Sequence, residues 1–172
     1  MKIICHNLWI SFFVTKSYRE FTDQVIAKKV DKNIDLDKDK NGIYYYCIWG
    51  KDSLTQENKF SVTFSSDYDE NSISFLVWDK LFILSTGAEL FFIDSNSMEI
   101  KCLFAFFTPL IGLHITKDNN LVVLEELSCK ILSCEGKIIK EYQFKDTIED
   151  FYLKEDCLNI TIADEEVAIK II

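Results

Sequence analysis

The strongest candidate for chemistry in this sequence is a short run of oxygen-bearing side chains. The segment DKDKNG, which starts at Asp37 and ends at Gly42, places carboxylates at alternate positions and a glycine at the sixth, as the first half of a calcium-binding loop does. Such a loop also needs a bidentate acid at its twelfth position, where this chain has Ile48. We therefore interpret the segment as a charged loop with an Asn-Gly turn, and we expect neither a metal ion nor a cofactor.

The cysteines and histidines give weaker evidence for a metal or catalytic site. Cys129 and Cys134 flank a predicted hairpin turn, but zinc needs four ligands, and neither a second cysteine pair nor a nearby histidine accompanies them. His114 alternates with apolar neighbours, which is typical of a half-buried residue in a strand. The sequence has no nucleophile elbow and no glycine-rich phosphate loop, so nothing marks convergent catalytic groups. We expect a protein that is not an enzyme.

The elements that would position these groups are mostly strands, and residues 1–72 are the less regular part. Ser17 and Glu20 fit a capping box, which predicts a helix from about Tyr18 to Lys29. The segment DKNIDLDKDKNG that follows is expected to be a charged loop. Bulky and β-branched residues predict the strands. These are Leu8–Val14, Ile43–Trp49 and Lys59–Phe64.

Residues 73–172 repeat. Each of three copies has a strand, a charged turn and a second strand, and the second strands begin at Leu81, Leu121 and Leu158, which are 40 and 37 residues apart. The first two copies continue with two further strands, and the third stops after VAIKII. A four-strand unit with a period of about 40–45 residues is the signature of a propeller blade.

In period and strand order, residues 73–172 resemble β-propeller blades. The GH and WD blade motifs are absent, since Trp78 and Asp79 form the only Trp-Asp pair and lie in a turn. We predict a mainly β fold: an antiparallel meander of propeller-like four-strand repeats, as a partial or open propeller or as a sandwich, with one short N-terminal helix. We expect one domain, residues 1–172.

The charge balance bears on partners. Asp and Glu number 28 against 19 Lys and Arg, which gives a net charge of −9; such a surface repels phosphate and favours a basic partner over nucleic acid. The apolar N-terminal stretch is interrupted by His6 and Asn7, unlike a signal peptide. No apolar run approaches the roughly 20 residues of a membrane span. We expect a soluble cytoplasmic protein with free thiols.

The acidic residues also cluster by position. In consecutive antiparallel strands, alternate turns lie at opposite ends of a sheet, so the turns after the second and fourth strands of each repeat share one end. Lys145 alone opposes eight carboxylates there, and we predict that these bind a cationic partner. They are Glu125, Glu126, Asp146, Glu149, Asp150, Asp164, Glu165 and Glu166.

In composition and class, the whole chain resembles the immunity proteins of contact-dependent growth inhibition and related polymorphic toxin systems. No diagnostic motif carries that resemblance, so no residue roles are transferred. It implies a cytoplasmic inhibitor that neutralises one cognate toxin, often a basic nuclease, by covering its active site. The alternatives are a non-catalytic, propeller-like protein-interaction scaffold, and an enzyme whose site is built from distant residues such as His114 and an acid.

Overall fold

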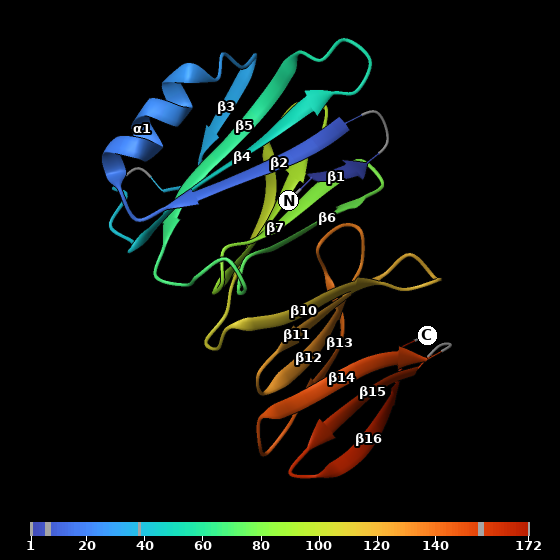
Figure 1. Ribbon diagram of the computed structural model, residues 1–172. Coiled ribbons are helices and arrows are strands. Elements are labelled where there is room, and N and C mark those ends of the chain that lie inside the picture. The colour runs from blue at the N-terminus through green and yellow to red at the C-terminus, as the bar shows by residue number, and fades with distance from the viewer. Residues whose placement is uncertain (1, 6–7, 38, 155–156, 172) are drawn as a thin grey trace. The chain divides into compact units, whose positions relative to one another are not determined.

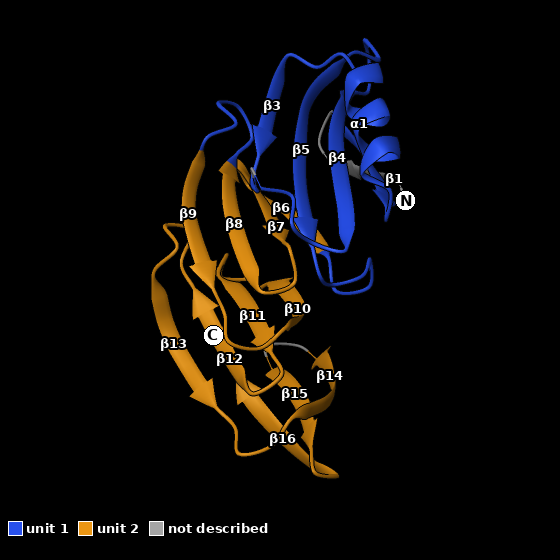
Figure 2. Cartoon of the chain, turned by 90° about the vertical axis from the view of Figure 1, so that its left-hand side faces the viewer, with its two compact units in different colours: residues 1–73, 94–99 blue, residues 74–93, 100–172 orange. Residues whose placement is uncertain are grey.

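The computed structural model describes residues 2–5, 8–37, 39–154 and 157–171, which form sixteen strands and one helix (Figure 1). The predicted mainly β fold class, with one short N-terminal helix, is confirmed. The chain divides into two compact units (Figure 2). Unit 1 comprises residues 1–73 and 94–99, and unit 2 comprises residues 74–93 and 100–172. The division at residue 73 lies where the sequence pattern changes.

Unit 1 is one five-stranded sheet with the order β1-β2-β4-β5-β3. The strand β3 runs parallel to β5, and the other neighbours are antiparallel. The helix packs on β2 and β4. The elements are β1 (Lys2–Cys5), β2 (Leu8–Thr15), α1 (Tyr18–Ala27), β3 (Lys32–Asp35), β4 (Tyr44–Asp52) and β5 (Asn58–Ser66).

The helix begins where the sequence predicts it. The side chain of Ser17 accepts a hydrogen bond from the backbone N–H of Glu20 at 3.3 Å. The other half of the capping box is different, because the Glu20 carboxylate accepts from the Thr15 hydroxyl at 2.7 Å. The helix ends at Ala27, two residues before the predicted end. It buries only Phe21, so packing of this ring, more than helix propensity, holds it on the sheet.

The predicted loop after the helix is wrong in its first part, because Lys32–Asp35 is a strand. The side chain of Asn33 accepts from the Ser61 hydroxyl at 2.6 Å, and that of Asp35 accepts from Thr63 at 3.2 Å. These bonds satisfy polar side chains along the parallel β3–β5 pair. A charged sequence of this kind does not alternate polar and apolar residues as a strand usually does. It is a strand only because it pairs with β5. The strand β1 was also missed.

Unit 2 consists of three sheets in chain order, which we call the first, middle and third sheets. The first contains β6 (Ser74–Trp78), β7 (Leu81–Ser85), β8 (Glu89–Asp94) and β9 (Ile100–Ala105). The middle contains β10 (Leu110–Ile115), β11 (Leu121–Glu125), β12 (Ser128–Leu132) and β13 (Ile138–Gln143). The third contains β14 (Ile148–Lys154), β15 (Cys157–Ile162) and β16 (Glu165–Lys170).

The repeat is visible in the hydrogen bonds as well as in the strand order. In the first and middle sheets, the segment that leaves the fourth strand is bonded back to the turn between the second and third strands. The two sets of bonds are related by a shift of 38 or 39 residues. They are Phe106 N to Ala88 O (2.8 Å) and Leu110 N to Gly87 O (2.9 Å), then Phe144 N to Leu127 O (2.9 Å) and Ile148 N to Glu126 O (2.8 Å).

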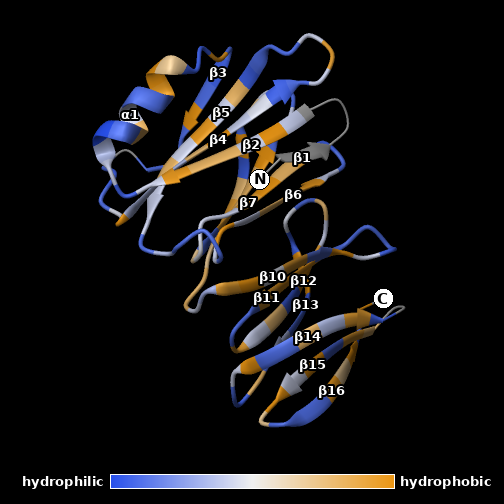
Figure 3. Ribbon diagram, in the orientation of Figure 1, coloured by the Kyte–Doolittle hydropathy of each residue, from blue (hydrophilic) through white to orange (hydrophobic). Residues whose placement is uncertain are grey.

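Apolar side chains fill the spaces between successive sheets of unit 2. One cluster, which includes Trp78 and Leu121, joins the first and middle sheets, and another, which includes Leu124 and Leu158, joins the middle and third. Figure 3 shows hydrophobic residues along these strands and hydrophilic residues in the turns. Burial of each such side chain stabilises the fold by about 1.5–3 kcal/mol. The Trp78 indole also donates to the Asn119 side chain at 2.7 Å.

Candidate functional site

Backbone hydrogen bonds and strand registers place seven of the eight predicted acidic residues at one end of the middle and third sheets. The carbonyl of Glu126 accepts from the N–H of Ile148, Ile148 pairs with Ile162, and Ile162 pairs with Glu165 across the next turn. We call this the acidic end of unit 2. Its carboxylates, Glu126 half-buried and the others exposed, are Glu126, Asp146, Glu149, Asp150, Asp164, Glu165 and Glu166.

The eighth predicted residue, Glu125, is not on this surface, and the expectation of an exposed carboxylate there was wrong. Glu125 is only 4% exposed. Its carboxylate accepts from the Ser128 hydroxyl at 2.6 Å and forms an ion pair with Lys130. Lys130 also lies 3.5 Å from the Glu141 carboxylate. Because its carboxylate is buried and paired with Lys130, Glu125 is a structural ion-pair partner and does not contribute to this surface.

The acidic end carries apolar residues that sequence reasoning missed. Phe107 is fully exposed, and Leu127 is 36% exposed. Phe107 lies in the segment that connects β9 to β10. This segment ends at Leu110, which pairs with Glu125, the last residue before the β11–β12 turn. The signal was present in the sequence, because Phe107 occupies the place in the first repeat that Lys145 occupies in the second.

The carboxylates of the acidic end are held locally but not neutralised. Asp146 and Asp150 each accept a hydrogen bond from the backbone N–H of the next residue. Glu166 accepts from the Tyr152 hydroxyl at 2.8 Å, and this bond raises the pKa of the tyrosine. Within the described part of unit 2, none of the seven carboxylates forms an ion pair. Like charges therefore remain close together at this surface.

The calcium-like segment of unit 1 is closed by its own lysine. The ammonium of Lys40, whose side chain is 9% exposed, is bonded to the Asp35 carboxylate and to the Asp37 carbonyl. The Asp37 carboxylate accepts from Ser65 and from two backbone N–H groups. Partial burial acts to raise the pKa of Asp37, but these bonds outweigh it and lower the pKa. The first of the carboxylates that would ligate a cation, that of Asp37, is thus already engaged.

The other groups singled out in the sequence do not converge. Cys129 is buried in β12, whereas Cys134 is exposed in the following turn. His114 is exposed on β10, and partial desolvation lowers its pKa. Among the described residues, no group of three or more His, Cys, Asp or Glu side chains is placed to hold a metal ion. The described helix is too short to cross a membrane.

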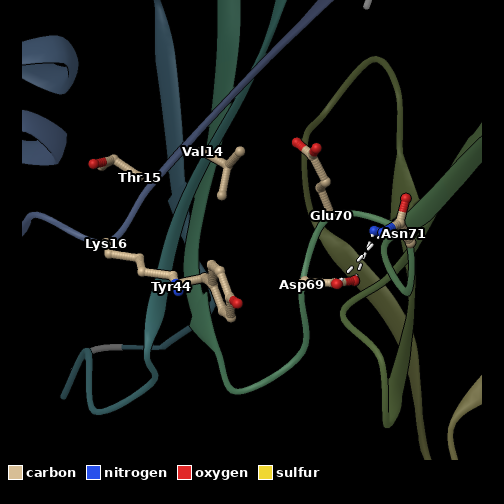
Figure 4. A pocket seen from close by; sticks show the side chains of 7 residues that line it. All are labelled: Val14, Thr15, Lys16, Tyr44, Asp69, Glu70 and Asn71. Atoms are coloured by element: carbon tan, nitrogen blue, oxygen red, sulfur yellow. Dashed lines mark hydrogen bonds between the residues drawn. The ribbon is translucent and has the colours of Figure 1, made fainter.

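Unit 1 has an open cavity of about 350 Å³ at one end of β2 and β4 (Figure 4). The Lys16 ammonium lies 4.8 Å from the centre of the Tyr44 ring. Opposite stand Asp69 and Glu70, and the Asp69 carboxylate accepts from the backbone N–H of Asn71 at 3.0 Å. Desolvation, with a smaller effect of Asp69, raises the pKa of the neighbouring Tyr46. The lining combines both charges, but it contains no nucleophile–base pair.

Comparisons with known proteins concern the fold. No protein-family model matches the sequence, and no curated protein matches it. Solved structures of propeller-like proteins are similar to it. They include BamB from Moraxella catarrhalis, with a TM-score of 0.50 and 16% identity over 72% of this chain and 39% of that one. Another is the dihydro-heme d1 dehydrogenase NirN, with a TM-score of 0.56 and 11% identity over 74% of this chain and 32% of that one.

A third similar structure is BBS1N, solved in complex with ARL6DN, with a TM-score of 0.50 and 6% identity over 73% of this chain and 45% of that one. The chain therefore spans less than half of the length of each of these proteins. Identities this low show a common fold alone. The expected β-propeller-like meander is confirmed by these neighbours.

Proposed function

We propose that this protein is a non-catalytic protein-binding module that docks the acidic end of unit 2 on a cationic surface of a partner protein. The observation that carries the proposal is a set of seven carboxylates at one end of two neighbouring sheets, none of which forms an ion pair with another described residue. A surface of this kind repels itself when free. A cationic partner relieves that repulsion and is steered to the surface by the same field.

Apolar contacts supplement the charge. Interfaces owe much of their affinity to a few large side chains that become buried, and charged groups around them tune rate and specificity. Phe107 and Leu127 are exposed apolar side chains at this end. In the proposed complex, Phe107 enters an apolar depression of the partner, and the carboxylates contact the lysines and arginines around it.

The more specific form of the proposal is an immunity protein. In this form the partner is a cognate toxin, such as a nuclease with a basic cleft, and the acidic end covers its active site in the cytoplasm. The net charge of −9 and the acidic end support this form. The alternative form, an interaction scaffold within a larger assembly, shares the same surface and is supported by the propeller-like fold.

Charge reversal tests the surface directly. The variant Glu126→Lys/Glu149→Lys changes the acidic end, and Asp118→Lys/Glu135→Lys makes the same change of charge in turns at the opposite end of the middle sheet. Affinity capture from the source cells should recover a partner with the wild type and with the second variant, but not with the first. Equal recovery by both variants, or a partner with an acidic contact surface, would contradict the proposal.

Growth assays separate the two forms. Each protein encoded beside this one is expressed in a test host, alone and together with this chain. A neighbour that stops growth, and whose effect this chain relieves, identifies an immunity function; the Glu126→Lys/Glu149→Lys variant should then fail to relieve it. Co-purification of a non-toxic assembly would favour the scaffold. Turnover of a substrate by the purified chain would refute both.

A further inference from the structure

The open cavity of unit 1 has two walls of opposite charge (Figure 4). The basic wall comes from the end of β2 and the start of β4, and it carries Val14, Lys16 and the Tyr44 ring. The acidic wall comes from the segment after β5, and it carries Asp69 and Glu70. The cavity volume of about 350 Å³ lies within the range of small-molecule pockets, about 300–1,000 Å³. The cavity can therefore hold a small ligand between the two walls.

The basic wall is held in place by strand pairing. Thr15 pairs with Tyr45 in the β2–β4 register. The next residues outward along the two strands are Lys16 and Tyr44, and the Lys16 ammonium lies 4.8 Å from the centre of the Tyr44 ring. A cation over an aromatic ring is held by the charge distribution of the ring. Lys16 forms no ion pair with another described residue, so its charge is available to a ligand.

The acidic wall is held in place by hydrogen bonds. The hydroxyl of the buried Tyr46 donates to the carbonyl of Tyr68 at 2.6 Å, which ties the segment after β5 to the sheet. The Asp69 carboxylate accepts from the backbone N–H of Asn71 at 3.0 Å. Glu70 is exposed, and its carboxylate forms no ion pair with another residue that the structure describes. Glu70 is therefore the carboxylate of this wall that a ligand can contact.

We infer that this cavity binds a dipeptide with free ends, whose carboxylate contacts Lys16 and whose ammonium contacts Glu70. A ligand with a single charge would be attracted by one wall and repelled by the other, whereas a zwitterion is attracted by both. Because the two walls face each other, the charges must lie at opposite ends of the ligand. A dipeptide meets this condition, but an α-amino acid, which carries both groups on one carbon, does not.

The apolar groups of the cavity define which residue of the dipeptide is apolar. Val14 and the Tyr44 ring are half-buried, and both belong to the basic wall. The side chain beside the carboxylate would cover them, and burial of apolar surface favours binding. The acidic wall offers no apolar side chain among its described residues, which are Asp69, Glu70 and Asn71. The dipeptide Ala-Leu has the required pattern, and Leu-Ala reverses it.

An NMR titration of the full chain with Ala-Leu tests the inference. The amide signals of residues 14–16 and 67–72 should shift on binding. Ala-Leu should bind about tenfold more tightly than N-acetyl-Ala-Leu, which lacks the ammonium, and than Ala-Leu amide, which lacks the carboxylate, because each blocked form loses one charge-assisted contact. Leu-Ala should bind more weakly than Ala-Leu. Equal binding of the free and blocked dipeptides, or no saturable binding of Ala-Leu, would overturn the inference.

Two variants assign each end of the dipeptide to its wall. Glu70→Gln should abolish the preference for a free N-terminus but keep the preference for a free carboxylate, and Lys16→Met should do the reverse. Loss of one preference while the other remains cannot come from a failure to fold. The matched controls Asp23→Asn and Lys29→Met change exposed charges outside the cavity and should keep both preferences. Both preferences intact in Glu70→Gln and Lys16→Met would overturn the inference.

Discussion

The strands β12 and β16 are both the third strand of their sheets, yet one is built for an interior and the other for a surface. Most of β12 is buried, and its one lysine is tied to Glu125 and Glu141. In β16, two glutamates and a lysine are exposed at the ends of an otherwise apolar strand. The difference shows that the position of a strand in the repeat determines its backbone pairing. The neighbouring sheet and strand determine how deeply its side chains are buried, and therefore how much each contributes to stability.

The largest expected difference between the two strands concerns their lysines. Lys130→Met leaves the buried Glu125 carboxylate without its ion-pair partner, and this should lower the free energy of unfolding by about 3–5 kcal/mol. Lys170→Met in β16 removes an exposed charge and should change it by less than about 0.5 kcal/mol. Urea unfolding measures both. Recovery of stability in the double variant Glu125→Gln/Lys130→Met would confirm that the unpaired carboxylate causes the loss.

Truncation of an apolar residue should destabilise the protein more in β12 than in β16. Ile131 of β12 is 4% exposed in the core between the middle and third sheets, so Ile131→Ala should cost about 2–5 kcal/mol. Val167 of β16 is 39% exposed, and Val167→Ala should cost less than about 1 kcal/mol. Thermal unfolding of the two variants measures the difference. Similar losses would mean that the edge of β16 is covered in solution.

The buried thiol of β12 should make stability depend on alkaline pH. Burial raises the pKa of Cys129 from 9.0 to about 12. The folded protein thus keeps a proton that the unfolded chain loses above pH 9. The stabilisation is complete below pH 9 and falls by roughly 1.4 kcal/mol per pH unit between pH 9 and 12. The slope of unfolding free energy against pH should decrease in Cys129→Ala, but remain in the third-sheet control Cys157→Ala.

The smallest expected effect lies in the turn that leads into β16. Ala163 and Asp164 both have positive φ values, 49° and 63°, which cost little for glycine but strain alanine. Ala163→Gly should therefore stabilise the protein by about 0.5–1 kcal/mol. The equivalent turn of the middle sheet, Glu126–Leu127, does not have positive φ values. Leu127→Gly should therefore give no gain in urea unfolding, and a gain would contradict this explanation.

The sequence by itself determined the elements whose signal is local. The repeat from residue 73, the turns between its strands and the helix start at Ser17 depend on neighbours a few residues apart, so periodicity and capping chemistry reveal them. The clustering of seven acidic residues at one end also follows from strand order alone. These features agree with the structure because antiparallel strands joined by short turns leave few alternative arrangements.

Only the tertiary structure decided the rest, because it depends on groups that are distant in sequence. The strand β3 exists through its pairing with β5, and Lys40 closes its loop by reaching Asp35. Glu125 has the composition of a rim residue, but β11 is buried along its whole length and the Glu125 carboxylate is paired with Lys130. Polar residues carry no signal of the direction in which they point. Their burial is determined by partners that only the folded chain brings within bonding distance.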